Sequence, residues 1–269
     1  MIKPQVFMGS SAESAELAKE VKRSLGNKYR AKIWYEDFFE ASDITLAKLL
    51  DKADSYDLAI FIFAPDDKLN LRGRELWATR DNVVFEYGLF LASLGQHQCF
   101  IFRPDGDECR VPTDLNGLTT INYLWTRSCK ASSSGKKESV FEFTLDGCME
   151  KLRRDIKAKT GPLSGRWIQN WEVSSTNYPL QNPSDASVLH FGDRFRAEFR
   201  SKRRQYEAIG NVAGHFISGI WRDKKHPENY HGTFQLKIQA SLDTLSGKWI
   251  GYSSVEGVKA GTWEWSRNA

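Results

Sequence analysis

The 269-residue sequence has no long hydrophobic run. No stretch approaches the roughly 18 apolar residues that a membrane-spanning helix needs, and the start, MIKPQVFMGSS, has no apolar core like that of a secretion signal. We found no internal repeat, which excludes solenoids and other repeat proteins. A cytoplasmic protein with no membrane partner is expected.

Metal-binding and disulfide patterns are also missing. The four cysteines show neither C-x-x-C nor Cys/His spacing, and the five histidines are scattered along the chain. No Ser/His/Asp or Cys/His grouping points to a nucleophilic site. We therefore expect no metal and no bound cofactor, and cysteines that are reduced and structural. A net charge of +4 is mild for this length and gives no reason to expect direct nucleic-acid binding.

The composition, 41% hydrophobic and 27% charged, is that of a folded protein long enough for two domains. A segment rich in Gly, Pro and Ser, KTGPLSG, follows residue 158 and is typical of a connector. All four cysteines precede it, and six of the nine tryptophans follow it. These shifts predict one domain over residues 1–160 and a second over residues 165–269.

Short apolar runs alternate with helical patterns in the first domain. This alternation predicts a parallel sheet covered by helices, an α/β fold with a flavodoxin-like layout. The strands are expected at residues 6–8, 31–35, 58–64, 99–102 and 119–123, and the helices at 14–25, 45–53, 82–94 and 138–157. An Arg-rich loop is expected before the third helix.

Ligands of such sheets bind beyond the carboxyl ends of the strands, where the strand order reverses. Gly9, Ser10 and Ser11 would let backbone N–H groups approach a phosphate at the start of a helix, although a helix capped by Ser11 or Ser14 explains the same residues. The aromatic segment that begins at Trp34 and includes residues 38–39 offers flat surfaces for a base, but such aromatics are more often packing residues.

The segment RDNVVFEYG places one carboxylate, Glu86, among apolar neighbours. Asn82 lies four residues earlier, on the same face of the predicted helix. Apolar surroundings raise a carboxyl pKa, whereas a nearby helix N-terminus lowers it. Spacing alone favours an ordinary glutamate that pairs with an arginine such as Arg80.

Four ordered blocks, VFMGSS, FIFAPDD, RDNVVFEYGLFLASLG and VPTDLNGL, resemble the TIR-like domains of bacterial antiphage systems, including those fused to STING domains. The resemblance extends to about residue 125. It implies an NAD+ nucleosidase in which Glu86, at the position of the glutamate of the NVxFExG helix, is the catalytic residue. It also implies that an NAD+ pocket is lined by the loop 9–11, Trp34, Asp66 and the turn 80–82, which contains Arg80 and Asn82. NAD+ would be the substrate and not a cofactor.

One carboxylate suits this chemistry. Nicotinamide leaves a cationic pyridinium as a neutral base, so no acid has to protonate the leaving group, unlike in ordinary glycosidases. Two alternatives stay open. A nucleoside deoxyribosyltransferase-like enzyme also breaks an N-glycosidic bond with a carboxylate, and a non-catalytic TIR-type module would only assemble and recruit.

Residues 165–269 show apolar and polar residues in alternation between Gly, Asn and Asp turns, which predicts a small antiparallel all-β barrel or sandwich. This part does not resemble a STING domain. The basic run at residues 194–204 could bind a phosphorylated ligand, although a solvated strand face explains it better. We expect this domain to sense a ligand such as a cyclic nucleotide and to drive the chain into a homo-oligomer or filament.

Overall fold

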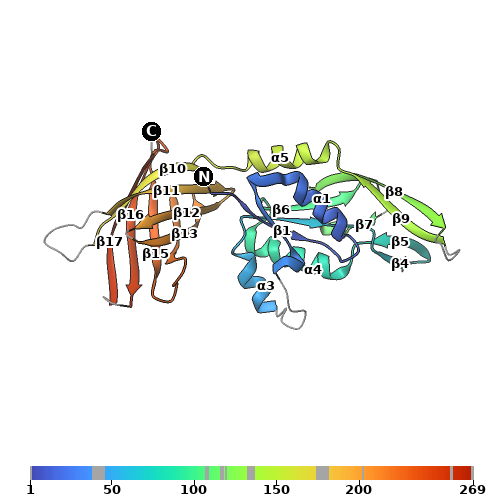
Figure 1. Cartoon of the computed structure of the whole chain (residues 1–269), viewed down its shortest axis with the longest axis horizontal. Helices are drawn as coiled ribbons and strands as arrows, with labels where there is room; N and C mark the ends of the chain where they lie inside the picture. Colours follow the sequence, from blue (N-terminus) through green and yellow to red (C-terminus); the bar gives the residue numbers. More distant parts are fainter. Residues whose placement is uncertain are drawn as a thin grey trace. The chain divides into compact units, whose positions relative to one another are not determined.

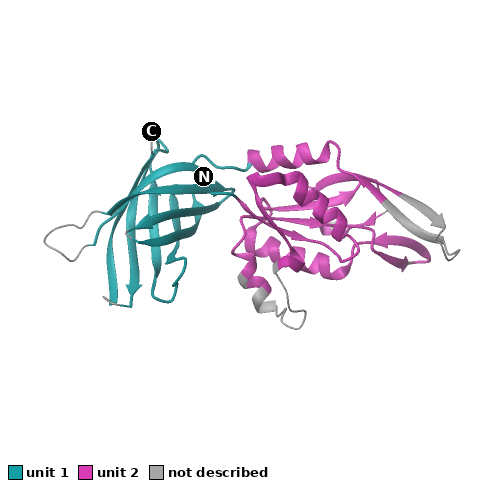
Figure 2. Cartoon of the chain, viewed as in Figure 1, with its two compact units in different colours: residues 1–3, 159–269 teal, residues 4–158 magenta. Residues whose placement is uncertain are grey.

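A computed structural model of the protein describes residues 2–37, 46–106, 109–115, 118, 120–131, 137–173, 182–201, 203–254 and 257–267. The aromatic residues 38–39 lie outside this set. The chain folds into two compact units (Figure 2), one formed by residues 4–158 and the other by residues 1–3 and 159–269.

The first unit is built on a six-stranded sheet of order β2-β1-β3-β6-β8-β9. Its first five strands are parallel and its last pair is antiparallel. The parallel order confirms the predicted flavodoxin-like layout. The strands are β1 (Gln5–Gly9), β2 (Arg30–Ile33), β3 (Leu58–Ile62), β6 (Cys99–Pro104), β8 (Thr120–Ala131) and β9 (Lys137–Thr144).

Helices cover the sheet (Figure 1), because each has one apolar face. Leu17, Val21 and Leu25 of α1, four residues apart, are all buried. The helices are α1 (Ala15–Leu25), α2 (Trp34–Asp37), α3 (Leu46–Ala53), α4 (Asp81–Leu94) and α5 (Cys148–Ala158), with short 3-10 turns at Gly26–Lys28 and Thr113–Leu115. None of the described helices is both long and apolar enough to cross a membrane.

The Arg-rich loop that we predicted is instead a hairpin. Strands β4 (Asp67–Leu71) and β5 (Arg74–Ala78) pair around the two-residue turn Arg72-Gly73, and β7 (Cys109–Arg110) adds a third strand. Both turn residues have positive φ, 52° and 78°, as a type I′ hairpin turn requires. Glycine at the second turn position was the sequence signal for this hairpin.

The prediction of one helix over residues 138–157 was wrong in its first half. Residues up to Thr144 form β9, which pairs with an extended β8, and the helix α5 begins only at Cys148. Phe141 and Phe143 alternate with polar residues, which is the period of a strand and not of a helix.

The second unit is a closed barrel of eight antiparallel strands in sequential order, which confirms a barrel over a sandwich. Alternate residues of each strand point inward, and one end of the interior is filled by Trp167, Phe195 and Trp265, each at most 1% exposed. The strands are β10 (Gly165–Trp171), β11 (Asn182–Phe191), β12 (Arg194–Ser201), β13 (Arg204–Ala213), β14 (Phe216–Asp223), β15 (Tyr230–Ile238), β16 (Thr244–Ser253) and β17 (Gly257–Arg267).

Gly88 lies on the exposed side of α4, and a Cβ atom there would meet no atom within 4 Å. Glycine inside a helix loses more backbone entropy than alanine on folding. We predict that Gly88→Ala raises the free energy of unfolding by about 0.5–1 kcal/mol, measured by urea denaturation. An unchanged or lower value would contradict this account of the helix.

Gly219 of β14 is the opposite case, because a Cβ atom there would lie 2.0 Å from the backbone carbonyl oxygen of Ile209 on the paired strand. Two backbones cannot separate without disturbing the ladder. We predict that Gly219→Ala lowers the free energy of unfolding by about 1–3 kcal/mol in the same assay. An unchanged free energy of unfolding would show that β13 and β14 can move apart at this position without loss of stability.

Candidate functional site

The candidate site lies where the strand order of the sheet reverses. The chain leaves β1 toward β2 on one side, and β3 pairs with β1 on the other, with Gly9 opposite Phe61. The carboxyl ends of these strands therefore meet at one edge, and ligands of open α/β sheets bind at such a point. The residues after β1, β2 and β3 include Ser10, Trp34 and Asp66.

Gly9 ends β1 against the ring of Phe61. A Cβ atom at this position would lie 2.4 Å from two ring carbons, so only glycine fits without displacing the ring. Phe61 in turn contacts Tyr87 of α4 edge-on, with ring centroids 5.4 Å apart. Packing thus explains the glycine and links the first turn to the helix that carries Glu86.

A hydrogen-bonded group joins the turn after β1 to Asp66. The backbone N–H of Ser14 donates to Ser11 Oγ at 3.1 Å, and Ser14 Oγ donates to Asp66 Oδ1 at 2.9 Å. The structure thus brings Ser11 and Asp66 together. Ser14, which the sequence suggested only as a cap, is the residue that connects them.

Two oxygens of this group are buried without a hydrogen-bond partner among the described residues, namely Ser10 Oγ and Asp66 Oδ2. Burial raises the pKa of Asp66, and hydrogen bonds from Ser11 and Ser14 oppose that rise. A buried polar atom without a partner costs roughly 1–3 kcal/mol, so such atoms are uncommon in folded proteins and often mark functional sites.

Trp34 begins α2 directly after β2 and packs against the hydrophobic core of the first unit. It also meets Tyr35 edge-on, at a centroid distance of 5.6 Å. Its indole Nε1 is a third buried polar atom without a partner in the described part of the chain. Trp34 is therefore a packing residue, and its N–H donor finds no acceptor among the described residues.

Arg80 precedes α4 and is held by carboxylates other than Glu86. Its Nη2 lies 2.9 Å from Glu13 Oε1 and 3.2 Å from Asp67 Oδ1. These contacts tie the start of α4 to the turn before α1 and to the start of β4. The ion pair between Arg80 and Glu86 that spacing suggested does not form.

Glu86 is half-buried on α4. Within the part of the chain that the structure describes, it makes no hydrogen bond and no ion pair. Burial alone raises its pKa from 4.5 to about 7. The adjacent Tyr87 is buried in the core, and its hydroxyl also has no partner among the described residues.

The flank of α4 that carries Glu86 faces α3. Ser93 lies seven residues later, close to two helical turns, and therefore on the same flank. Its hydroxyl donates to Asp54, just after the end of α3, at 2.6 Å. Asn82 shares this flank but is exposed. It therefore lies one helical turn before Glu86, and no contact joins it to the hydrogen-bonded group of Ser11, Ser14 and Asp66.

Arg103 near the end of β6 is a further polar residue at this edge that had no assigned role. Its Nη2 donates to the carbonyl oxygen of Gly106 at 3.0 Å, whereas its Nε is buried without a partner among the residues described. The sequence signal was its position, directly after the apolar run of a buried strand.

Comparisons with known proteins agree with this fold. Residues 5–124 match the family model described as "CAP12/Pycsar effector protein, TIR domain". The Pycsar effector protein PaPycTIR of Pseudomonas aeruginosa is 40% identical over 124 residues, 46% of this chain and 40% of that protein. CD-NTase-associated protein 12 of Flavobacterium daejeonense is 36% identical over 137 residues, 51% of this chain and 43% of that protein. The chain thus spans less than half the length of both relatives.

Solved structures add little. Transferrin binding protein B of Haemophilus parasuis aligns with 53% of this chain and 32% of its own, with a TM-score of 0.28 and 11% identity. A DUF3598-family protein from Nostoc punctiforme aligns with 54% of this chain and 61% of its own, with a TM-score of 0.26 and 12% identity. Similarity this low carries no argument about fold or function.

The family match begins at the first residue of β1 and ends within β8. It therefore contains all eight residues predicted for the site and excludes the barrel. Residues 5–124 of this chain form a TIR-like domain that matches the model of the CAP12 and Pycsar effector TIR domain, and a closed eight-stranded β-barrel follows it in the sequence.

Proposed function

We propose that the TIR domain cleaves NAD+ at the bond between nicotinamide and ribose, with Glu86 as the catalytic carboxylate. The observation that carries this proposal is the environment of Glu86, which is half-buried and has no cationic partner among the described residues. Its helix begins at the sheet edge where the turn after β1 and Asp66 meet, since Arg80 is bonded to Glu13 and Asp67 there.

The reaction consumes NAD+ and water and gives ADP-ribose, nicotinamide and a proton. As the glycosidic C–N bond breaks, its electron pair goes to the nicotinamide ring, which becomes neutral, and the ribose carbon gains positive charge. An ionised Glu86 would stabilise this charge and orient a ribose hydroxyl or the water that adds to the carbon. The added water then loses its proton.

The raised pKa suits a carboxylate that meets a cation. Near neutral pH about half of the Glu86 side chains would be ionised in the free protein, because the pKa is about 7. The positive nicotinamide ring favours the ionised form and would lower this pKa on binding. Partial withdrawal from water also strengthens the attraction between the carboxylate and the charge that develops in the transition state.

The remaining residues would hold the substrate. Ser10 Oγ and Asp66 Oδ2 have no hydrogen-bond partner among the described residues and could each bond the substrate. The turn at Gly9, Ser10 and Ser11 leads into α1, whose N-terminus favours a phosphate. Trp34 would contribute its indole N–H, and Asn82 would hold the ribose beside Glu86.

The names of the relatives suggest a role in antiphage defence. One relative is named a "Pycsar effector protein" and the other a "CD-NTase-associated protein". We infer that this chain is such an effector, that a nucleotide second messenger bound by the barrel activates it, and that activation proceeds through self-assembly of the TIR domains.

Replacing Glu86 tests the catalytic role. We predict that Glu86→Gln lowers nicotinamide release from NAD+ by at least about 100-fold, because the neutral amide does not stabilise the cationic transition state. The full chain is assayed over a wide range of protein concentrations, with Glu75→Gln, the same change at an exposed position of β5, as the control. A folded Glu86→Gln protein with the wild-type rate would refute the proposal.

A second assay supplies a deoxynucleoside and a free base in place of NAD+. Turnover of these substrates without cleavage of NAD+ would identify a nucleoside deoxyribosyltransferase-like enzyme instead.

The raised pKa of Glu86 should also make the free energy of unfolding depend on pH. Below pH 4.5 Glu86 is protonated in the folded and unfolded states, whereas between pH 4.5 and about 7 only the folded state keeps the proton. The contribution of Glu86 to stability therefore falls as the pH rises through this window. We predict that Glu86→Gln is more stable than the wild type above about pH 7, by roughly 1–2 kcal/mol after allowance for partial exposure, and that the difference disappears near pH 4. A pH-independent difference in urea denaturation would contradict the raised pKa.

A further inference from the structure

One end of the barrel interior is open, although the other end is packed. A cavity of about 570 Å³ lies there, within the size range of small-molecule sites. Its lining comes from strands all around the barrel, so it is part of the barrel interior and not a surface groove. The lining includes Trp171, Trp221, Trp249, Arg203, Arg204 and Lys259.

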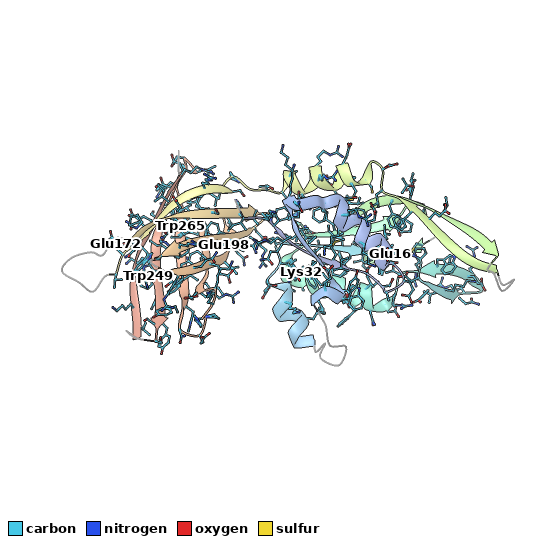
Figure 3. The ribbon with its side chains drawn as sticks, viewed as in Figure 1. Glu16, Lys32, Glu172, Glu198, Trp249 and Trp265 are labelled. Atoms are coloured by element: carbon cyan, nitrogen blue, oxygen red, sulfur yellow. The ribbon has the colours of Figure 1, made fainter. Side chains whose placement is uncertain are left out.

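Aromatic rings form a continuous wall of this cavity. Trp249, labelled in Figure 3, meets Trp171 and Trp221 edge-on at centroid distances of 5.9 and 5.8 Å. Trp221 meets Tyr206 at 6.0 Å, and Tyr206 stacks on Phe199 at 5.5 Å. In an edge-to-face pair only one of the two rings has a face covered by its neighbour, so these contacts fix the rings without covering all of their faces.

Hydrogen bonds hold two of these indoles in place. Trp249 Nε1 donates to the carbonyl oxygen of Glu172 at 3.1 Å, and Trp171 Nε1 donates to Ser201 Oγ at 3.3 Å. The wall is therefore preorganised, so a ligand would not have to order these side chains on binding.

Glycines on the neighbouring strands provide the space for the ring of Trp221. Trp221, Gly232, Gly251 and Lys259 form one inward-facing row across β14 to β17. A Cβ atom on Gly251 would lie 2.1 Å from the ring of Trp221, and one on Gly232 would lie 2.7 Å from its Nε1. The ring of Trp221 thus lies flat over two residues without side chains, and Lys259 ends the same row.

The charged groups that line the cavity are all positive. Arg203, Arg204 and Lys259 are cationic, and none of the described lining residues carries a carboxylate. Arg204 is paired with the buried Asp223 at 3.1 Å and bonds the hydroxyl of Tyr230 at 3.2 Å. Besides this pair, Arg203 and Lys259 are the cationic side chains of the described lining.

We propose that this cavity binds a nucleotide, with the base against the aromatic wall of Trp171, Trp221 and Trp249 and the phosphate at Arg203 and Lys259. The proposal rests on the sensory role proposed above and specifies its site and chemistry. Aromatic faces stack on nucleobases, and cations at the same cavity bind phosphate. A fatty acid would also supply an anion, but its flexible chain gains nothing from ordered rings and would favour an aliphatic lining.

The binding test uses the full chain and follows the quenching of tryptophan fluorescence, with calorimetry for the affinity. The probes are 3′,5′-cyclic AMP, 3′,5′-cyclic UMP and cyclic di-AMP, with adenosine, uridine and palmitate for comparison. We expect at least one of the three nucleotides to bind and to quench fluorescence, and the matching nucleoside to bind at least tenfold more weakly. The proposal would be overturned if none of the three nucleotides bound at millimolar concentration, whether or not palmitate bound.

Substitutions locate the site. Arg203→Ser with Lys259→Ser should weaken nucleotide binding at least tenfold, whereas Arg200→Ser with Lys248→Ser, the same changes at exposed positions of β12 and β16, should not. Trp221→Leu should weaken binding tenfold or more through lost stacking. If both double variants were folded by circular dichroism and lost nucleotide affinity equally, the ligand would have to bind outside this cavity.

A third variant separates this proposal from the catalytic one. Glu86→Gln should bind the nucleotide with wild-type affinity, since Glu86 belongs to the other compact unit. If nucleotide binds but no NAD+ is cleaved, the catalytic proposal fails alone. If NAD+ is cleaved but no nucleotide binds, the cavity proposal fails alone.

Discussion

The proposed cleavage of NAD+ depends on one carboxyl group, that of Glu86, which is partly withdrawn from water and has no cation beside it among the described residues. Burial favours its neutral form, and this raises the pKa of Glu86 to about 7. The helix α4 keeps the group in this position because Tyr87 and Phe90 anchor it in the core. The nearest arginine in sequence, Arg80, is engaged by Glu13 and Asp67. The carboxylate is therefore left to meet a positive charge supplied by a ligand.

The two units provide binding groups in different ways. In the TIR domain a rigid sheet brings short polar turns to one edge, where Ser10 and Asp66 keep oxygens without partners among the described residues. In the barrel, closure of the sheet removes exposed edges and turns alternate side chains inward. Large tryptophans therefore line a cavity, and glycines make room for the ring of Trp221. Both frameworks hold their polar or aromatic groups before a ligand arrives, which lowers the entropic cost of binding.

Much of the fold could be predicted from the sequence. Apolar runs such as 58–64 and helical spacing such as that of Leu17, Val21 and Leu25 are local signals, and they predicted the flavodoxin-like layout. The alternation of apolar and polar residues after residue 165 predicted a barrel or sandwich. The hairpin β4–β5 and the strand β9 were missed because their local signals, a glycine in a two-residue turn and a short alternation of phenylalanines, are weak, and pairing between strands decides both elements. Within the site, the position of Glu86 on its helix was predictable. The partners of Arg80 and the link from Ser14 to Asp66 were not, because residues 13 and 14 meet residues 66, 67 and 80 only in the folded chain.

The pKa of Glu86 is the quantity that tests the central claim most directly. It can be measured in the full chain labelled with 13C at the glutamate carboxyl carbons, with Glu86→Gln used to assign the resonance. The account predicts a titration midpoint near pH 7 in the free protein, which moves lower when NAD+ is present in the unreacted state at low temperature. A midpoint near the ordinary value of 4.5 would show that the carboxyl group is solvated like any surface glutamate, and the proposed site would lose its basis.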